Sequence, residues 1–270
     1  SLPEERQPAP DAKKIAIVGA GPAGLTVASD LAERGFAVTV YEATEAAGGM
    51  LRWGIPEYRL PRNVLDHEIE LIRRKGVTFQ YNCRVGKDVS VDQLRSDNDA
   101  VFVGIGTQKG SSLGVAGEDL PGVTQALDFL YQTNCGQTPK VSGKVVVIGG
   151  GDAAMDAARV ALRLGAESVT VLYRRSAAEM PASPEEVKQA KDEGVQFQYL
   201  TAPAVFLDGG GRLGSVRCTR MQLGEPDASG RRRPIPIQGS EFEVQSDMAI
   251  LAIGSVPDAA FAQAAPDLPV

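Results

Sequence analysis

Two stretches decide the fold: IAIVGAGPAG at residues 15–24 and VVVIGGGDAA at residues 145–154. Each is a run of apolar residues without polar alternation, followed at once by a glycine-rich turn and a helix-forming segment. A continuous apolar run is typical of a strand that is buried on both faces, as in a parallel sheet covered by helices. Each stretch therefore predicts a strand, a tight turn and a helix, in that order.

The two turns share a spacing that suits phosphate binding. The first reads GxGxxG from Gly19 to Gly24, and the second reads GxGxxA from Gly149 to Ala154. In such turns the first glycine permits the tight bend, the second lets the main chain approach a pyrophosphate, and the third small residue allows close helix–strand packing. The free N–H groups at the helix N-terminus then hold the phosphates. One such turn is a weak signal, but two in the right context predict two dinucleotide-binding units.

The residues that close the second strand of each unit differ in charge. Glu42 follows the apolar segment 37–41, whereas Arg174 and Arg175 follow the segment 168–173. A carboxylate accepts hydrogen bonds from a ribose 2′-OH and repels a 2′-phosphate, which a guanidinium binds in a bidentate manner. The first site therefore suits FAD or NAD, and the second favours NADPH over NADH, unless the two arginines are merely solvated.

Together the two sites predict FAD beside NADPH. Hydride transfer between them is carried by the cofactors, so we name no catalytic side chain.

The bulk composition excludes several classes of protein. The chain has 270 residues, a net charge of −6 and no apolar run near the ~20 residues that a membrane span needs. The mild acidity argues against nucleic-acid or membrane-surface binding, because both need clustered positive charge. The three cysteines are far apart and form no CxxC, so we predict no metal site. We expect a cytoplasmic protein.

The fold class predicted is α/β, with two Rossmann-like units. A leader covers residues 1–12, the FAD unit covers 13–108, and the NADPH unit, 109–246, is inserted before the FAD unit returns at 247–270. Two short segments, DAVFVGIGT and DMAILAIGS, each combine an acid, a buried strand and a glycine turn. The second of them is taken as the returning strand of the FAD unit. A hairpin with a glycine turn, followed by a further strand, predicts a small antiparallel layer between residues 201 and 244.

Four longer motifs carry a resemblance to a known family. They are GGMLRWGIPEYRLPRNVLDHEIELIRRKGVTF (48–79), GTQKGSSLGVAGEDLPGV (106–123), YRRSAAEMPASPEEVKQAKDEGVQF (173–197) and LGEPDASGRRRP (223–234). From about residue 13 onward the chain resembles the small (beta) subunit of NADPH-dependent glutamate synthase. It is also similar to the FAD/NADPH domains of dihydropyrimidine dehydrogenase and of paralogous iron–sulfur oxidoreductases. The resemblance implies that NADPH reduces FAD and that electrons leave through iron–sulfur clusters to a larger partner subunit.

Carried over position by position, the resemblance assigns one set of residues to each cofactor. For FAD these are Gly19, Gly21, Pro22, Ala23, Gly24, Glu42, Gly49, Met50, Arg59, Val85 and Gly106. For NADPH they are Gly149, Gly150, Gly151, Asp152, Ala153, Arg174 and Arg175.

The chain also departs from the family pattern. The family carries a cysteine-rich domain before the first glycine turn and a flavin-contacting Gly-Asp pair after the last strand, and these 270 residues contain neither. We therefore expect an excised fragment with an incomplete FAD site, and iron–sulfur clusters only in the N-terminal region of the whole protein or in a partner. Two alternatives stay open: a paralogous subunit with another electron acceptor, and a subunit that binds NADPH without turnover.

Overall fold

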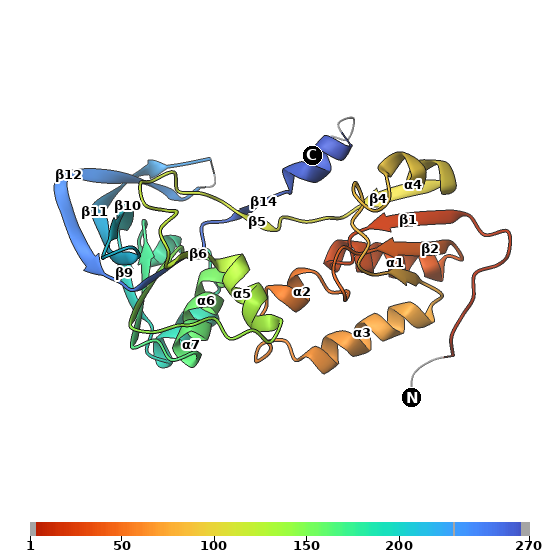
Figure 1. Ribbon diagram of the computed structural model, residues 1–270, viewed down its shortest axis with the longest axis horizontal. Helices are drawn as coiled ribbons and strands as arrows, with labels where there is room; N and C mark the ends of the chain where they lie inside the picture. The colour runs from red at the N-terminus through yellow and green to blue at the C-terminus, as the bar shows by residue number, and fades with distance from the viewer. Residues whose placement is uncertain (1–3, 229, 266–270) are drawn as a thin grey trace. The chain divides into compact units, whose positions relative to one another are not determined.

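The computed structural model describes residues 4–228 and 230–265, and the chain divides into two compact units (Figure 1). Unit 1 comprises Ser1–Lys109 and Val256–Val270, and unit 2 comprises Gly110–Ser255. The chain crosses between the units twice, and the two crossings pair as a two-stranded sheet of β5 (Lys109–Gly110) and β14 (Ser255–Val256).

Unit 1 is built on a four-stranded parallel sheet with the strand order β3-β2-β1-β4. Its elements are β1 (Lys14–Val18), α1 (Pro22–Glu33), β2 (Ala37–Tyr41), α2 (Met50–Trp53), α3 (Arg62–Arg74), β3 (Thr78–Gln80), α4 (Val91–Asp97), β4 (Ala100–Val103) and α8 (Ala259–Ala264). The predicted strand–turn–helix–strand unit is thus present. Helix α1 begins with Pro22 at its first turn and ends before Gly35, which adopts φ +88° and donates its N–H to the carbonyl of Ala32.

The central strand β1 is buried on both faces, as its apolar run predicts. Ile17 points to one face and packs in a cluster with Leu25 of α1, while Val18 points to the other and packs in a cluster with Leu94 of α4. Because successive side chains of a strand alternate between faces, only a continuous apolar run satisfies both layers.

Unit 2 repeats this plan and adds an antiparallel layer. Its parallel sheet has the order β6-β13-β7-β8-β9, and its antiparallel sheet has the order β10-β11-β12. Its elements are β6 (Val123–Gln125), α5 (Ala126–Asn134), β7 (Lys144–Ile148), α6 (Asp152–Arg163), β8 (Ser168–Tyr173), η1 (Ala177–Glu179), α7 (Pro184–Asp192), β9 (Gln196–Tyr199), β10 (Thr201–Asp208), β11 (Leu213–Pro226), β12 (Arg232–Gln245) and β13 (Met248–Leu251). The predicted α/β class, with its small antiparallel layer, is confirmed.

One strand lies in a different unit from the one predicted. We expected the segment that begins at Asp247 to return to the FAD unit, but β13 pairs in parallel with β6 and β7, inside unit 2. The physical reason is a pair of hydrogen bonds between Asp247 and Lys144, which we call a clamp. Asp247 donates its N–H to the carbonyl of Lys144, and its carboxylate accepts the N–H of Lys144 at 2.8 Å.

Unit 1 contains the same clamp. Asp99 donates to the carbonyl of Lys14, and its carboxylate accepts the N–H of Lys14 at 2.8 Å. The two acid–strand–glycine segments are therefore equivalent strands, one beside the first strand of each unit. The chain re-enters unit 1 at Val256 and not at about residue 247.

The antiparallel layer is a long ribbon. β11 pairs with β10 up to Arg220, and with β12 from Ser215 to Pro226, so the end of β11 beyond Met221 is paired with β12 alone. The hairpin between β10 and β11 turns at the predicted glycines, where Asp208 accepts the N–H groups of Gly210 and Gly211.

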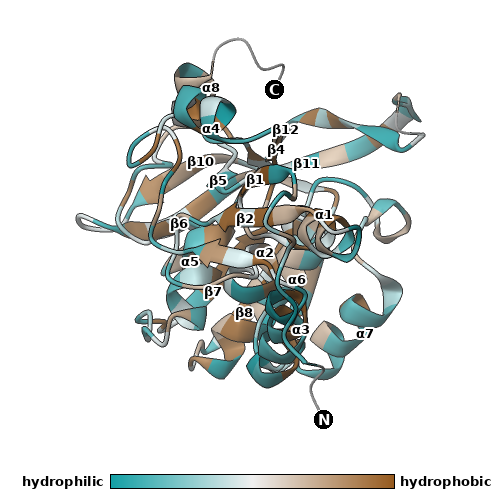
Figure 2. Cartoon of the chain, turned by 90° about the vertical axis from the view of Figure 1, so that its right-hand side faces the viewer, coloured by the Kyte–Doolittle hydropathy of each residue, from teal (hydrophilic) through white to brown (hydrophobic). Residues whose placement is uncertain are grey.

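Hydropathy follows these layers. In Figure 2 the strands β2 and β8 are brown, whereas the ribbons of α3 and α7 are largely teal. Helices with a polar outer face and apolar strands beneath them are what a covered parallel sheet requires. Among the described residues, no helix has the length and apolar character needed to cross a membrane.

Candidate functional site

The first candidate site is the glycine turn of unit 1. Gly19 adopts φ +99°, and a Cβ added to it would lie 2.5 Å from the carbonyl oxygen of Gly104. A Cβ on Gly24 would collide with the carbonyl oxygen of Gly19, so this residue permits the close contact between α1 and β1. At Gly21, in contrast, the nearest atom stands 4.0 Å away. The turn is therefore closed toward the protein and open at the glycine that would face a pyrophosphate.

A second glycine pair packs over this turn. Gly48 adopts φ +128° and donates its N–H to the carbonyl of Ala20 at 2.8 Å, and Gly49 adopts φ +50°. A Cβ on Gly49 would stand 2.7 Å from the Cα of Gly21. The structure thus brings Gly49 and the start of α2 against the glycine turn.

Glu42 is buried where β2 ends, with 6% of its surface exposed. Its carboxylate accepts the N–H of Ala20 and the N–H of Thr44, both at 2.8 Å. The hydroxyl of Thr44 lies 2.8 Å from the same carboxylate and accepts the indole N–H of Trp53 at 3.3 Å. Glu42 therefore joins the glycine turn to the loop after β2, a role that its position in the sequence did not reveal.

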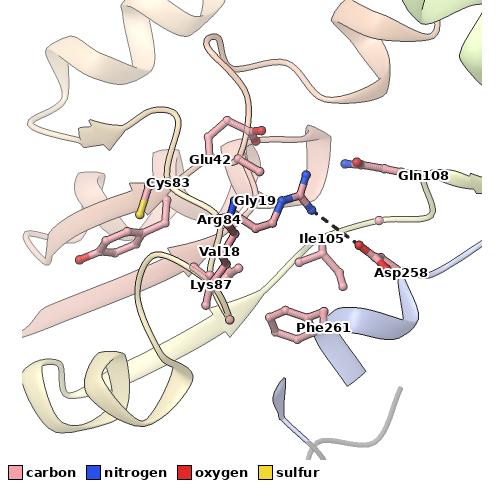
Figure 3. Close-up of a pocket in the computed structure, with 15 residues that line it drawn as sticks. Val18, Gly19, Glu42, Cys83, Arg84, Lys87, Ile105, Gln108, Asp258 and Phe261 are labelled. Carbon is pink, nitrogen blue, oxygen red and sulfur yellow. Dashed lines mark ion pairs between the residues drawn. The ribbon is translucent and has the colours of Figure 1, made fainter. Parts of the chain in front are cut away.

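A pocket of about 240 Å³ opens beside Glu42 within unit 1 (Figure 3). Val85, which is 7% exposed, lines it together with Gly106. Arg84 and Asp258 form an ion pair of 3.6 Å across the pocket wall. The complete lining is Val18, Gly19, Tyr41, Glu42, Ala43, Cys83, Arg84, Val85, Gly86, Lys87, Ile105, Gly106, Gln108, Asp258 and Phe261. A small apolar pocket between a glycine turn and a carboxylate fits the adenosine end of a dinucleotide.

Cys83 lines this pocket but is not set up as a nucleophile. Burial, followed by the charge of Asp88, raises the pKa of the Cys83 thiol above its ordinary value. Because a thiolate is the reactive form, a thiol with a raised pKa stays protonated and inert near neutral pH.

Met50 and Arg59, which are assigned to FAD, lie neither in the glycine turn nor in the pocket lining. Met50 is the first residue of α2, and a Cβ added to Gly54 would lie 3.0 Å from its sulfur. Arg59 is partly buried after the turn at Pro56 and donates its N–H to the carbonyl of that proline. Their proximity to a flavin remains a prediction.

The second candidate site is the glycine turn of unit 2, and it has the same geometry as the first. Gly149 adopts φ +144°, and a Cβ on it would collide with the carbonyl oxygen of Ala252. A Cβ on Gly150 would lie 2.5 Å from the ring of Tyr173. Gly151, with φ −92°, has no atom within 4 Å of the place of its missing Cβ. This turn is thus also closed on the protein side and open where a pyrophosphate would approach.

The segment after β8 folds back onto this turn. The hydroxyl of Tyr173 donates to the carbonyl of Glu179 at 2.7 Å, and Ala182 donates its N–H to the carbonyl of Gly150 at 3.0 Å. Ser183 donates its N–H to the carboxylate of Asp152 at 3.0 Å. The carboxylate of Asp152 therefore fixes this segment, because it accepts a hydrogen bond from the main chain of Ser183.

The two arginines after β8 have different surroundings. Arg174 is exposed, and among the described residues its side chain has no hydrogen-bond or ion-pair partner. Arg175 is 5% exposed and donates to the carboxylate of Asp227 at 2.7 Å and to the carbonyl of Arg232 at 2.8 Å. The sequence led us to expect that both would face the same phosphate, but the structure leaves only Arg174 free.

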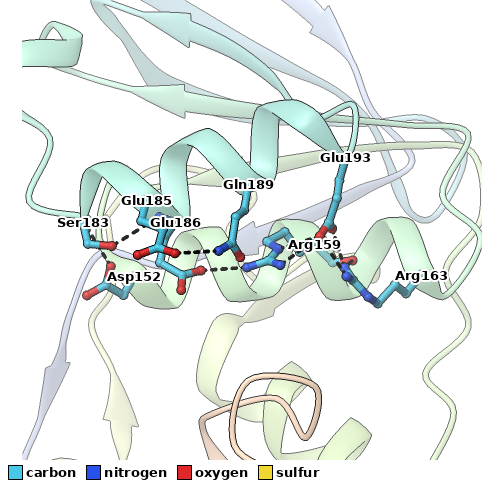
Figure 4. A network of polar contacts seen from close by, with 8 residues as sticks. All are labelled: Asp152, Arg159, Arg163, Ser183, Glu185, Glu186, Gln189 and Glu193. Carbon is cyan, nitrogen blue, oxygen red and sulfur yellow. Dashed lines mark hydrogen bonds and ion pairs between the residues drawn. The ribbon is translucent and has the colours of Figure 1, made fainter.

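Helices α6 and α7 are held together behind the site by a network of charges (Figure 4). The buried Arg159 donates to Glu186 at 2.7 Å and to Glu193 at 2.8 Å, and Arg163 also donates to Glu193 at 2.5 Å. The hydrogen bonds from Arg163 and then Arg159 hold the pKa of Glu193 at about 2. Because α6 presents the phosphate turn at its N-terminus, this network fixes the helix that carries the site.

No group of three or more His, Cys, Asp or Glu side chains in residues 4–228 and 230–265 could hold a metal ion. Glu42 follows the strand beside the glycine turn in unit 1, and Arg174 follows the corresponding strand in unit 2.

The comparisons with known proteins agree with this geometry. The beta subunit of the NADP(+)-dependent formate dehydrogenase of Moorella thermoacetica is 50% identical over 261 residues, which cover 96% of this chain and 37% of that protein. The glutamate synthase [NADPH] small chain of Escherichia coli (strain K12) is 43% identical over 257 residues, covering 91% of this chain and 54% of that protein. This confirms the resemblance predicted from the motifs. The chain therefore spans 37% and 54% of the length of these two relatives.

The fold also has solved counterparts. Mycobacterium tuberculosis FprA, in a structure of its complex with NADPH, superposes with a TM-score of 0.79 at 23% identity, covering 91% of this chain and 72% of that one. At that identity the likeness establishes the fold. Residues 13–267 match the family described as pyridine nucleotide-disulphide oxidoreductase. The chain therefore belongs to the pyridine nucleotide-disulphide oxidoreductase family.

Proposed function

We propose that this chain is the FAD- and NADPH-binding module of an oxidoreductase of the glutamate synthase small-subunit type. One contrast supports the proposal most directly: two equivalent glycine turns lie beside strands that end in a buried carboxylate, Glu42, and in an exposed guanidinium, Arg174. The first environment accepts an unmodified ribose, and the second attracts a 2′-phosphate.

Unit 1 is proposed to hold FAD. The pyrophosphate would lie against the open side of Gly21, with Pro22, Ala23 and the N-terminus of α1 beyond it. The ribose would reach the carboxylate of Glu42, and the adenine would enter the pocket at Val85. In this arrangement Glu42 holds the turn and the ribose with the same carboxylate.

Unit 2 is proposed to hold NADPH. Gly151 offers open space to the pyrophosphate, and Ala153 lies in the first turn of α6, which follows that glycine. Arg174 supplies a free cation for the 2′-phosphate at the end of the next strand. When both cofactors are bound, they supply the redox chemistry, a hydride passing from the nicotinamide to the flavin ring.

A partner is proposed to take the electrons onward. The relatives carry names with different redox reactions, among them an NADP(+)-dependent formate dehydrogenase, an NADPH-Fe(3+) oxidoreductase and a glutamate synthase. The common element in these names is a beta subunit or small chain, which supports a larger partner subunit as the next carrier. The cytoplasmic location expected from the sequence stays a prediction.

The dinucleotide preference of unit 2 tests this proposal. Calorimetric titration of the chain with NADP⁺ and with NAD⁺ should give tighter binding of NADP⁺. Arg174→Ala should weaken NADP⁺ about tenfold or more, the equivalent of one charge-assisted hydrogen bond, and leave NAD⁺ unchanged. Equal affinities of the unaltered chain for the two nucleotides would refute the assignment.

A further inference from the structure

The side chain and main chain of Arg175 are both committed to the protein. Its guanidinium donates to the carboxylate of Asp227 at 2.7 Å and to the carbonyl of Arg232 at 2.8 Å. Its own carbonyl accepts the N–H of Leu200, just after β9, at 3.1 Å. These bonds join the end of β8 to β9 on one side and to the tip of the ribbon on the other.

Asp227 lies in the turn at that tip. Its N–H donates to the carbonyl of Arg231 at 2.8 Å, which closes the turn between β11 and β12. The turn leads into three consecutive arginines, Arg231 to Arg233. The side chain of Arg232 donates to the carbonyls of Leu223 and Gly224, so that the strands are tied side by side at this point. The Asp227–Arg175 pair thus anchors a basic turn at the edge where Arg174 stands.

Arg175 cannot turn toward a ligand without breaking this arrangement. The side chain of Arg175 is 7% exposed and that of Asp227 is 24% exposed, and separating a largely buried pair leaves an uncompensated charge. Arg174 makes no such contact and is exposed. The two neighbouring arginines therefore differ in role: Arg175 binds other parts of the protein, and Arg174 is exposed to solvent.

We propose that Arg175 and Asp227 are positioning residues for NADPH: their ion pair holds the basic ribbon turn and the end of β8 in place, and Arg174 alone of the arginine pair contacts the 2′-phosphate. This inference rests on the proposed binding of NADPH to unit 2. It assigns a role in cofactor discrimination to an acid 52 residues away in sequence.

The direction in which one substitution changes the affinity for NADP⁺ distinguishes a positioning role of Asp227 from a simple charge effect. Asp227→Asn removes a negative charge near the phosphate, so charge alone would tighten NADP⁺ binding. If Asp227 positions the site, Asp227→Asn weakens NADP⁺ instead, by about fivefold, the worth of one net hydrogen bond. Binding of NAD⁺ stays unchanged, and Asp227→Glu, which keeps the carboxylate, restores part of the preference. All titrations use the chain of residues 1–270 at one ionic strength.

A matched control lies at the opposite end of β11. Asp208 caps the other hairpin turn by accepting the N–H groups of Gly210, Gly211 and Arg212, and it has no hydrogen bond or ion pair with β8 among the described residues. The two acids are separated by roughly 40 Å of extended strand, at about 3.3 Å per residue. Asp208→Asn removes the same charge and should leave the ratio of the two affinities as it was.

A double-mutant cycle then tests whether Arg175 acts through Asp227. If it does, Arg175→Ala and the double variant Arg175→Ala/Asp227→Asn lose the same NADP⁺ preference, because either change breaks the pair. Unchanged or tighter NADP⁺ binding in Asp227→Asn overturns the proposal, as does an equal loss for both nucleotides. If Arg174→Ala weakens NADP⁺ while Asp227→Asn does not, the positioning role fails and the NADPH site stands. If Arg174→Ala has no effect, the site assignment itself fails.

Discussion

Glu42 and Arg174 occupy matching strand ends, but they relate to the fold in different ways. The carboxylate of Glu42 is already bonded to the N–H groups of Ala20 and Thr44, whereas the side chain of Arg174 has no partner among the described residues. A change at Glu42 would therefore disturb both the glycine turn and the ribose site. A change at Arg174 should alter affinity alone, which makes it the cleaner probe of cofactor choice.

The glycines of the unit 2 turn differ in the same way, and this gives a prediction. Gly151 has an ordinary φ of −92° and open space in front of it. Gly151→Ala should therefore fold normally, while its methyl group occupies the space that the pyrophosphate needs. We expect NADP⁺ affinity to fall by roughly an order of magnitude, the cost of losing a charged hydrogen bond, with little change in the melting temperature.

Gly149 is the matched control for this prediction. Gly149 adopts φ +144°, and a Cβ added to it would collide with the carbonyl oxygen of Ala252, the residue that follows β13. Gly149→Ala should thus destabilise unit 2 by about 2–4 kcal/mol, because strain and collision coincide. Calorimetry and thermal melts on both variants check the pair. A Gly151→Ala protein that binds NADP⁺ as tightly as the parent would show that the phosphate does not approach this turn.

At the scale of elements, helices α6 and α7 depend on charges that are sensitive to acid. The pKa of Glu193 is held at about 2 by Arg163 and Arg159, below its ordinary value of 4.5. A carboxyl whose folded pKa is lowered stabilises the fold fully above the unfolded pKa and loses that contribution as the pH falls through the folded pKa. We therefore expect unit 2 to lose stability between about pH 4.5 and pH 2.

The loss assigned to Glu193 is on the order of 2 kcal/mol, allowing for screening of a side chain that is 28% exposed. Glu193→Gln should flatten the pH dependence of the free energy of unfolding, measured by urea denaturation across this range. Glu185→Gln is the control, since this carboxylate on the same helix accepts a hydrogen bond from the neutral amide of Gln189. An equal pH slope in Glu193→Gln and the unaltered chain would contradict the role of the network.

Local signals in the sequence predicted most elements of both units. The apolar runs, the glycine turns and the helix ends at Gly35 and Gly165 each depend on residues a few positions apart. The strand that begins at Asp247 was assigned to the wrong unit, because its clamp on Lys144 joins residues about a hundred positions apart. Similarly, no residue near Arg175 in the sequence predicts its ion pair with Asp227. No residue near Glu42 predicts that its carboxylate accepts the N–H of Ala20. Long-range polar contacts of this kind depend on the packing of whole elements.

At the scale of the molecule, two units with separate cores each present one glycine turn. The cores of unit 1 gather around β1, and those of unit 2 gather around β7. A duplicated fold of this kind can bind two related dinucleotides while single residues at the strand ends tell them apart. The assignment of an arginine to one unit and a carboxylate to the other identifies the unit proposed for each dinucleotide, NADPH in unit 2 and FAD in unit 1.

Anaerobic mixing of the flavin-loaded, full-length protein with NADPH or NADH tests the central claim most directly. The visible absorption band of the flavin should bleach with NADPH, and more slowly or only at higher concentration with NADH, because Arg174 favours the 2′-phosphate. Arg174→Ala should reduce this advantage of NADPH without abolishing bleaching. A flavin that stays oxidised in the presence of NADPH, or that bleaches equally with both nucleotides, would contradict the account.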